Sequence, residues 1–168
     1  MSFALEERPA GWCDEAPIQI RHELFLPASP ERVFDVMADI GGWTAWFRGM
    51  RRIRIDGPAT GVGARRTVWV GLSRVGEHFT VWEPGRHLAF HIVDCNLPGL
   101  KVMVEDYQIE PDSEGGVDGS RLRATVAVEA KRPLALLPGL VRLAVGRPTS
   151  GALGIADVFT KPPEASAA

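Results

Sequence analysis

Residues 26–39, with the sequence LPASPERVFDVMAD, contain the signals that decide the fold. Pro27 ends an apolar strand, and Ser29 and Pro30 then supply a helix N-cap and a first helical residue. Apolar residues follow at helical spacing until the glycines at 41–42. The stretch therefore predicts a strand that leads directly into a helix.

The flanking segments extend this pattern on both sides. Residues 18–26 alternate with apolar side chains on one parity, which predicts the first strand. Residues 1–16 show no period and are expected to form an N-terminal tail, in which Trp12 either folds back onto the domain or lies at a contact. A second short helix is expected over 43–49, where apolar residues recur at i, i+3, i+4 and i+7.

The rest of the chain changes to strands and then back to helix. Short links rich in glycine and proline predict an antiparallel meander. Leucines and valines at helical spacing in 134–145 predict a helix that Pro138-Gly139 interrupts, and Gly146 to Pro148 is expected to break the helical pattern again. A further turn or two is expected over 153–159, and residues 161–168 should form a C-terminal tail, so 17–160 make up a single domain. The six strand runs after Met50 are 51–56, 64–72, 75–83, 86–94, 101–110 and 121–131.

The order strand, two short helices, six strands and C-terminal helix resembles the START/Bet v 1-like superfamily. Residues 26–39, Trp43-Thr-Ala-Trp-Phe47, Gly63-Ala-Arg-Arg66 and residues 82–90 are similar to its polyketide cyclase/dehydrase and lipid-transport branch, the SRPBCC group. The resemblance implies an α+β helix-grip fold, in which a curved seven-stranded antiparallel sheet surrounds a C-terminal helix. It also implies an internal cavity, but the same scaffold serves both carriers and enzymes.

Strand parity predicts which side chains face that cavity. In 75–83 the inward set is taken as Val75, Glu77, Phe79 and Val81, and in 101–110 it includes Glu105 and Tyr107. Two carboxylates would then point inward, either as polar anchors or proton-transfer groups or as strand-end residues that reach water or an arginine. The expected ligand-binding residues are Trp43, Phe47, Met50, Phe79, Phe90, Met103, Glu105, Tyr107, Leu136 and Leu140.

Two functions from different classes fit these residues. The favoured one is binding or transport of an apolar, lipid- or polyketide-like molecule. The alternative is a polyketide cyclase/aromatase or dehydratase that uses Glu105 and Tyr107 as its catalytic residues. In the aromatase/cyclase members that the chain resembles, a tyrosine comes three residues after the helix phenylalanine, and this chain has Met50 there.

Composition and motifs argue against several other classes. The net charge of −2 and a pI near 6.1 argue against nucleic-acid binding. Two cysteines without CxxC spacing argue against a disulfide framework, and no motif indicates a cofactor. Three histidines, His78, His87 and His91, share an outer parity, but their spacing predicts no metal site. With no signal peptide and no run of 18 apolar residues, the chain is expected to be cytoplasmic and without stable membrane insertion, while its tryptophans allow a homodimer.

Overall fold

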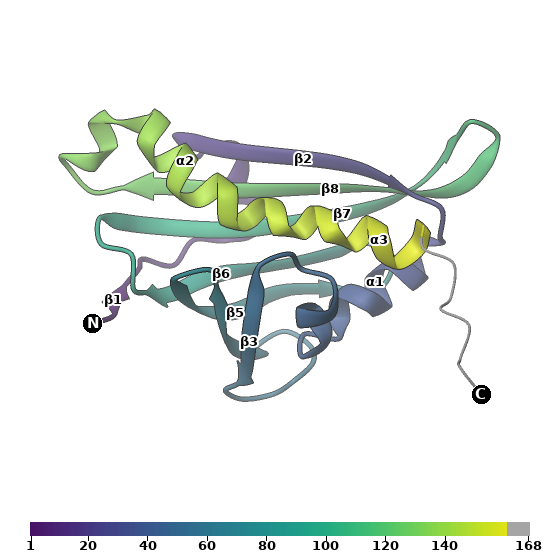
Figure 1. The fold of residues 1–168 in the computed structure, drawn as a ribbon, viewed down its shortest axis with the longest axis horizontal. Helices are drawn as coiled ribbons and strands as arrows, with labels where there is room; N and C mark the ends of the chain where they lie inside the picture. The colour runs from purple at the N-terminus through teal and green to yellow at the C-terminus, as the bar shows by residue number, and fades with distance from the viewer. Residues whose placement is uncertain (161–168) are drawn as a thin grey trace.

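The computed structural model describes residues 1–160 and has one curved antiparallel sheet with helical segments across one face (Figure 1). The main path of the sheet has the order β2-β8-β7-β6-β5-β4-β3, and β1 pairs separately with β6. This architecture confirms the predicted α+β helix-grip fold. The strands are β1 (Phe3–Ala4), β2 (Ile18–Leu26), β3 (Met50–Ile55), β4 (Arg65–Val70), β5 (Ser73–Glu83), β6 (His87–Cys95), β7 (Leu100–Glu114) and β8 (Val117–Ala130).

Helix α1 (Pro30–Ala38) begins as the sequence predicts. The Ser29 hydroxyl accepts a hydrogen bond from the Arg32 backbone N–H at 3.3 Å, and Pro30 occupies the first turn. The helix expected over 43–49 is reduced to one 3-10 turn, η2 (Gly42–Ala45). After η2 the chain enters β3 at Met50. Trp43, Trp46 and Phe47 nevertheless belong to the buried core, as the sequence pattern indicated.

The C-terminal helical region is more continuous than the sequence predicts. After η3 (Leu134–Leu136), helix α2 (Pro138–Thr149) begins at Pro138 and runs on through Gly146 to Pro148. It is followed without a gap by η4 (Ser150–Gly154) and α3 (Ile155–Thr160) (Figure 1). Proline is compatible with a first helical turn, and an internal glycine costs only about 1 kcal/mol relative to alanine. Pro148 lies inside the helical stretch, where proline costs about 3 kcal/mol. Tertiary burial of Val145, Thr149 and Ala152, rather than local propensity, keeps the segment helical. The expected break at 146–148 was therefore wrong, and the tail predicted at 161–168 lies outside the described residues.

The N-terminal segment is not the unstructured tail that its sequence suggested. It contains β1 and the 3-10 helix η1 (Ala10–Asp14). Trp12 packs against a small apolar cluster on the outer face of the sheet, which confirms that it folds back onto the domain. The cluster consists of Cys13, Ala16, Val102, Val104 and Ala127.

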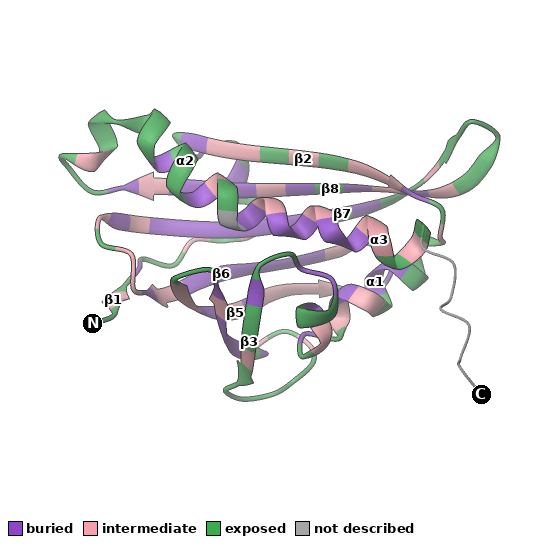
Figure 2. Ribbon diagram, in the orientation of Figure 1, coloured by how far each residue is buried: buried purple, intermediate pink, exposed green. Residues whose placement is uncertain are grey.

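The main core lies on the opposite face, between the sheet and helices α1 and α2. Figure 2 shows buried residues in the middle of the C-terminal helical stretch, around η4, while the first turns of α2 are exposed and α3 is mostly intermediate or exposed. Phe79 and Phe90 point into this core, but Val81 does not belong to it. The pairing of β5 with β6 shifts by one residue between Phe79 and Val81, which leaves Thr80 as an extra residue in β5. As a result Trp82, rather than Val81, faces inward and packs against Phe79.

The C-terminal segment is fixed to the chain after η2 by very close packing. The Arg48 backbone N–H donates to the Gly151 carbonyl at 3.0 Å, and the Arg48 side chain pairs with Asp157 at 3.0 Å. A Cβ atom added at Gly154 would lie 2.0 Å from the Trp46 carbonyl oxygen. Only glycine permits this approach of the two backbones.

We therefore expect Gly154→Ala to lower the free energy of unfolding by about 1–3 kcal/mol, the usual range for overpacking. Gly139→Ala is the matched control, because a Cβ there meets nothing within 4 Å and alanine favours the helix. Urea unfolding of both variants measures the effect. Equal stabilities would show that the contact between η4 and Trp46 is not required.

Candidate functional site

A small cavity lies between the sheet and α2. Its volume is about 40 Å³, measured as the space open to the centre of a water molecule, which is enough for a few waters. Trp43, Phe47 and Met50 form one wall, Met103 and Glu105 of β7 form another, and Val145 of α2 closes the cavity. The wall is therefore mostly apolar and is assembled from segments far apart in the sequence.

The structure brings five of the ten predicted ligand-binding residues to this wall and leaves the others elsewhere. Phe79, Phe90 and Tyr107 are buried directly behind it. Leu136 is 71% exposed and lies away from the cavity, whereas Leu140 is 53% exposed and lines two grooves beside α2 rather than the cavity itself. The five on the wall are Trp43, Phe47, Met50, Met103 and Glu105.

Helical spacing explains the outward position of Leu140. The face of α2 that turns toward the sheet carries Val141, Val145 and Thr149, which are four residues apart and buried. Leu140 and Leu143 lie beside this row and remain exposed. The sequence predicted an apolar helix, but the point at which the helix starts decides which leucines face inward.

A buried ion pair lies beside the cavity, and the sequence reasoning missed its cation. Arg66 of β4 donates from Nε to Glu77 Oε2 at 2.5 Å and from Nη1 to the Ile40 carbonyl at 2.7 Å. Its guanidinium carbon lies 3.9 Å from the centre of the Trp43 ring. Arg66 shares its parity with Val68 and Val70, which are buried, so strand parity contained the signal.

Glu105 is the polar group that faces the cavity beside this pair. The Tyr107 hydroxyl donates to Glu105 Oε2 at 2.6 Å. Burial, and secondly the negative charge of Glu77, raise the pKa of Glu105 from 4.5 to about 7. Burial and the Glu105 charge raise the pKa of Tyr107 well above its usual value, so the phenol stays protonated as a donor. Glu105 can therefore hold or release a proton near neutral pH.

Two grooves flank α2 and share residues with the cavity. One, of about 570 Å³, lies between α2 and the turn from β4 to β5 and shares Val70, Ser73 and Ala144 with the cavity. The other, of about 250 Å³, lies between α2 and the turn from β6 to β7 and shares Leu97 and Leu100. Movement of α2 would therefore join the cavity to both grooves.

Candidate metal ligands lie on the other side of the sheet. Among residues 1–160, the only group of at least three such side chains close enough to share an ion is Glu7, His78 and His91. His87, expected beside the other two histidines, is instead paired with Asp106. The sequence had predicted no metal site because these ligands come from three separate segments.

Removing one partner of the buried ion pair should be strongly destabilising. Glu77→Ala would leave the Arg66 guanidinium buried without its carboxylate, at a cost of about 3–5 kcal/mol. Glu110→Ala is the control, because it removes an exposed partner of Arg123 and should cost less than about 1 kcal/mol. Chemical unfolding of the two variants checks this, and similar losses would show that the buried pair has no special weight.

The raised pKa of Glu105 should appear in the pH dependence of stability. The folded state binds this proton more tightly than the unfolded chain, so the contribution of Glu105 is complete below pH 4.5 and is lost as pH rises through about 7. Glu105→Gln stays neutral and should lose less stability than the wild type over that interval. Urea unfolding at a series of pH values measures the difference, and parallel profiles would contradict the raised pKa.

Comparisons with known proteins find chains that are similar in sequence or in fold. A curated Mycobacterium tuberculosis protein, described as uncharacterized, is 29% identical over 133 residues, which is 78% of this chain and 77% of that protein. An aromatase/cyclase from Streptomyces sp. R1128 has a similar structure, with TM-score 0.66, 14% identity and coverage of 82% of this chain and 90% of that one. A START superfamily protein from Mycobacterium smegmatis has TM-score 0.65 and 12% identity, covering 84% and 99%. At these identities the two solved structures show the shared fold alone.

In the described part of the chain, no helix combines the length and apolar character needed to cross a membrane.

The family follows from a match over most of the chain. The model of one family, described as polyketide cyclase/dehydrase and lipid transport, matches residues 17–153. The chain belongs to the polyketide cyclase/dehydrase and lipid transport family.

Proposed function

We propose that this protein binds and transports an apolar small molecule, lipid- or polyketide-like, between the sheet and α2. The observation that carries the proposal is the cavity wall, in which aromatic, aliphatic and methionine side chains surround a small polar corner at Glu77 and Glu105. Pockets for small molecules generally combine an apolar wall with a few polar groups that fix orientation. Burial of apolar ligand surface contributes about 25 cal/mol per Å² without any catalysis.

Ligand entry requires α2 to move. Small-molecule pockets usually measure roughly 300–1,000 Å³, far more than the cavity of about 40 Å³. Since the cavity shares residues with both flanking grooves, a displaced α2 would open one continuous space along the sheet. We therefore assign α2 the role of a lid that closes over the ligand.

Glu105 gives the ligand a polar contact. With a pKa of about 7, its carboxyl group can donate to a ligand oxygen when protonated and accept a hydrogen bond when ionised. The Tyr107 hydroxyl holds the carboxyl in place from behind the wall. A ligand with one polar end and a long apolar body fits this arrangement.

The second candidate is a cyclase/aromatase or dehydratase. The same position and pKa of Glu105 favour it, because a carboxyl group that titrates near neutral pH suits proton transfer. Met50 lies on the cavity wall where the aromatase/cyclase members have a tyrosine, and a thioether cannot transfer a proton. For this reason we favour the carrier. A cytoplasmic location and a homodimer stay predictions.

The carrier proposal predicts saturable binding of a fatty-acid analogue whose fluorescence responds to polarity. Val145→Trp fills the cavity from α2 and should weaken binding by about tenfold or more, since its bulk occupies the ligand space. Val117→Trp is the matched control, because it is the same substitution at an exposed residue of β8 that lines neither the cavity nor the two grooves. Circular dichroism verifies that both variants fold, and native mass spectrometry of the purified protein detects any ligand carried from the host.

Three outcomes decide between the candidates. Binding that Val145→Trp weakens and Val117→Trp leaves unchanged supports the carrier. No saturable binding, or equal binding by both variants, contradicts it. Turnover of a polyketide-like substrate that is lost in Glu105→Gln, while the affinity for that substrate is kept, would instead establish the enzyme.

A further inference from the structure

Two histidines lie side by side on the outer face of the sheet. His78 of β5 and His91 of β6 are register partners, and their ring centroids are 5.0 Å apart. Their chain neighbours Phe79 and Phe90 are also register partners and point the other way, into the core. The register that builds the core therefore also places the two imidazoles together on the opposite face.

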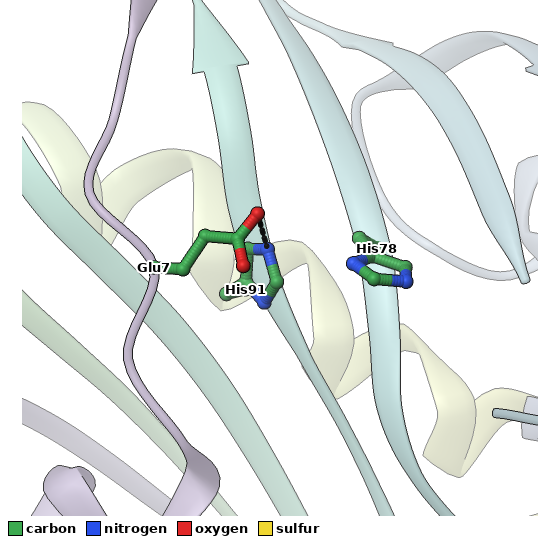
Figure 3. A group of neighbouring side chains, drawn as sticks. All are labelled: Glu7, His78 and His91. Carbon is green, nitrogen blue, oxygen red and sulfur yellow. Dashed lines mark ion pairs between the residues drawn. The ribbon is translucent and has the colours of Figure 1, made fainter. Parts of the chain in front are cut away.

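The N-terminal segment brings a carboxylate to the same place. β1 pairs with β6, and the Leu5 and Glu6 backbone N–H groups donate to Val93 and Lys101 at 3.0 and 2.8 Å. Glu7 follows directly, and its Oε1 lies 3.3 Å from His91 Nε2 (Figure 3). One potential ligand atom from each of the three residues falls within 4.8 Å of the other two.

The buried imidazole of His91 has unsatisfied polar atoms. Its side chain is 2% exposed, and within residues 1–160 neither ring nitrogen has a hydrogen-bond partner. The contact with Glu7 has the distance of an ion pair but not the geometry of a hydrogen bond. The buried Nδ1 of His78 is also without a partner in this part of the chain. Buried polar groups without partners are rare and destabilising. His22 Nε2 and Arg66 Nη2 also lack partners within the described residues. Among these side chains, only His78 and His91 share a group of potential metal ligands with a carboxylate, and this grouping indicates a missing ligand.

We propose that Glu7, His78 and His91 form a binding site for a divalent transition-metal ion such as Zn²⁺, with water as a further ligand. Two imidazoles and one carboxylate suit zinc and its neighbours, whereas Mg²⁺ and Ca²⁺ prefer oxygen ligands. Zinc bonds of about 2.0–2.1 Å require ligand atoms about 3.4 Å apart in a tetrahedron. The ligand atoms now lie within 4.8 Å of one another and must move closer together to bind the ion. Movement of the exposed Glu7 side chain and rotation of the His78 ring would bring them closer.

A positively charged side chain lies beside the three ligands. Arg65 is the register partner of His78 on β4, and its positive charge opposes a cation. Its side chain is exposed, so solvent screens that charge, and Glu7 offsets it.

The metal ion would connect the N-terminal segment to two strands of the sheet. Glu7 comes from the segment before η1, and the histidines come from β5 and β6. The site lies on the face opposite the cavity, so it is independent of the proposed ligand binding. Metal binding is expected to stabilise the folded state by mass action.

Titration of the tag-free, EDTA-treated protein with Zn²⁺ by calorimetry tests the site, and Co²⁺ absorption reports coordination. The wild type should bind one ion and show a higher Tm with the metal. Glu7→Gln and His78→Ala should each weaken binding by more than about tenfold, because loss of even an outer partner of a metal site costs about 10–100-fold. His22→Gln, on β2, is the histidine control and should bind as the wild type does.

Glu7→Gln and His78→Ala change side chains that are not fully buried, so both variants should fold. Their Tm values without metal verify this. An ion bound by the wild type and by His22→Gln but not by the other two variants supports the site. Absence of saturable binding by the wild type would overturn the proposal. Equal binding by all four proteins would overturn it as well, because the ion would then lie elsewhere.

Discussion

The Arg66–Glu77 ion pair joins the parts of the molecule that surround the cavity. The guanidinium lies between β4 and β5, donates to the carbonyl of Ile40 after α1 and stacks on Trp43. Arg66 Nη2 has no hydrogen-bond partner among the described residues, so loss of Glu77 or of the Ile40 contact would leave this buried charge with little compensation. The pair thus couples the strand register, the end of α1 and the position of the aromatic wall.

The same pair sets the chemistry of the site. Burial and the negative charge of Glu77 raise the pKa of Glu105 to about 7, whereas Arg66 opposes the rise that burial causes in the pKa of Glu77 itself. The apolar wall and the titrating carboxyl serve a carrier and a cyclase equally well. A second proton-transfer group in the cavity would separate the two functions. Met50 lies on the cavity wall, at the position where the resemblance to the aromatase/cyclase members implies a tyrosine.

Several elements followed directly from the sequence because their causes are local. Ser29 and Pro30 start α1 as predicted, and residues 18–26 form β2 with the predicted ends. Parity correctly placed Glu105 inward, but it failed at Val81, since one extra residue in a strand reverses every side chain beyond it. Parity also contained the signal for Arg66, but a charged side chain was not expected to face a core.

By itself, the sequence determined most strands after residue 17, the start of α1 and the apolar character of the cavity wall, because turn residues and periodicity act over short distances. The helix-grip fold was implied by the resemblance to a known superfamily, and β1 and η1 were not predicted. Only the tertiary structure decided which groups meet. Leu140 stays exposed because α2 turns Val141, Val145 and Thr149 toward the sheet. Arg66 meets Glu77 because the two are register partners in the pairing of β4 with β5. Glu7 reaches His78 and His91 through the pairing of β1 with β6. Such contacts join segments distant in the sequence, and they depend on strand pairing and on bulges that the apolar pattern alone did not reveal.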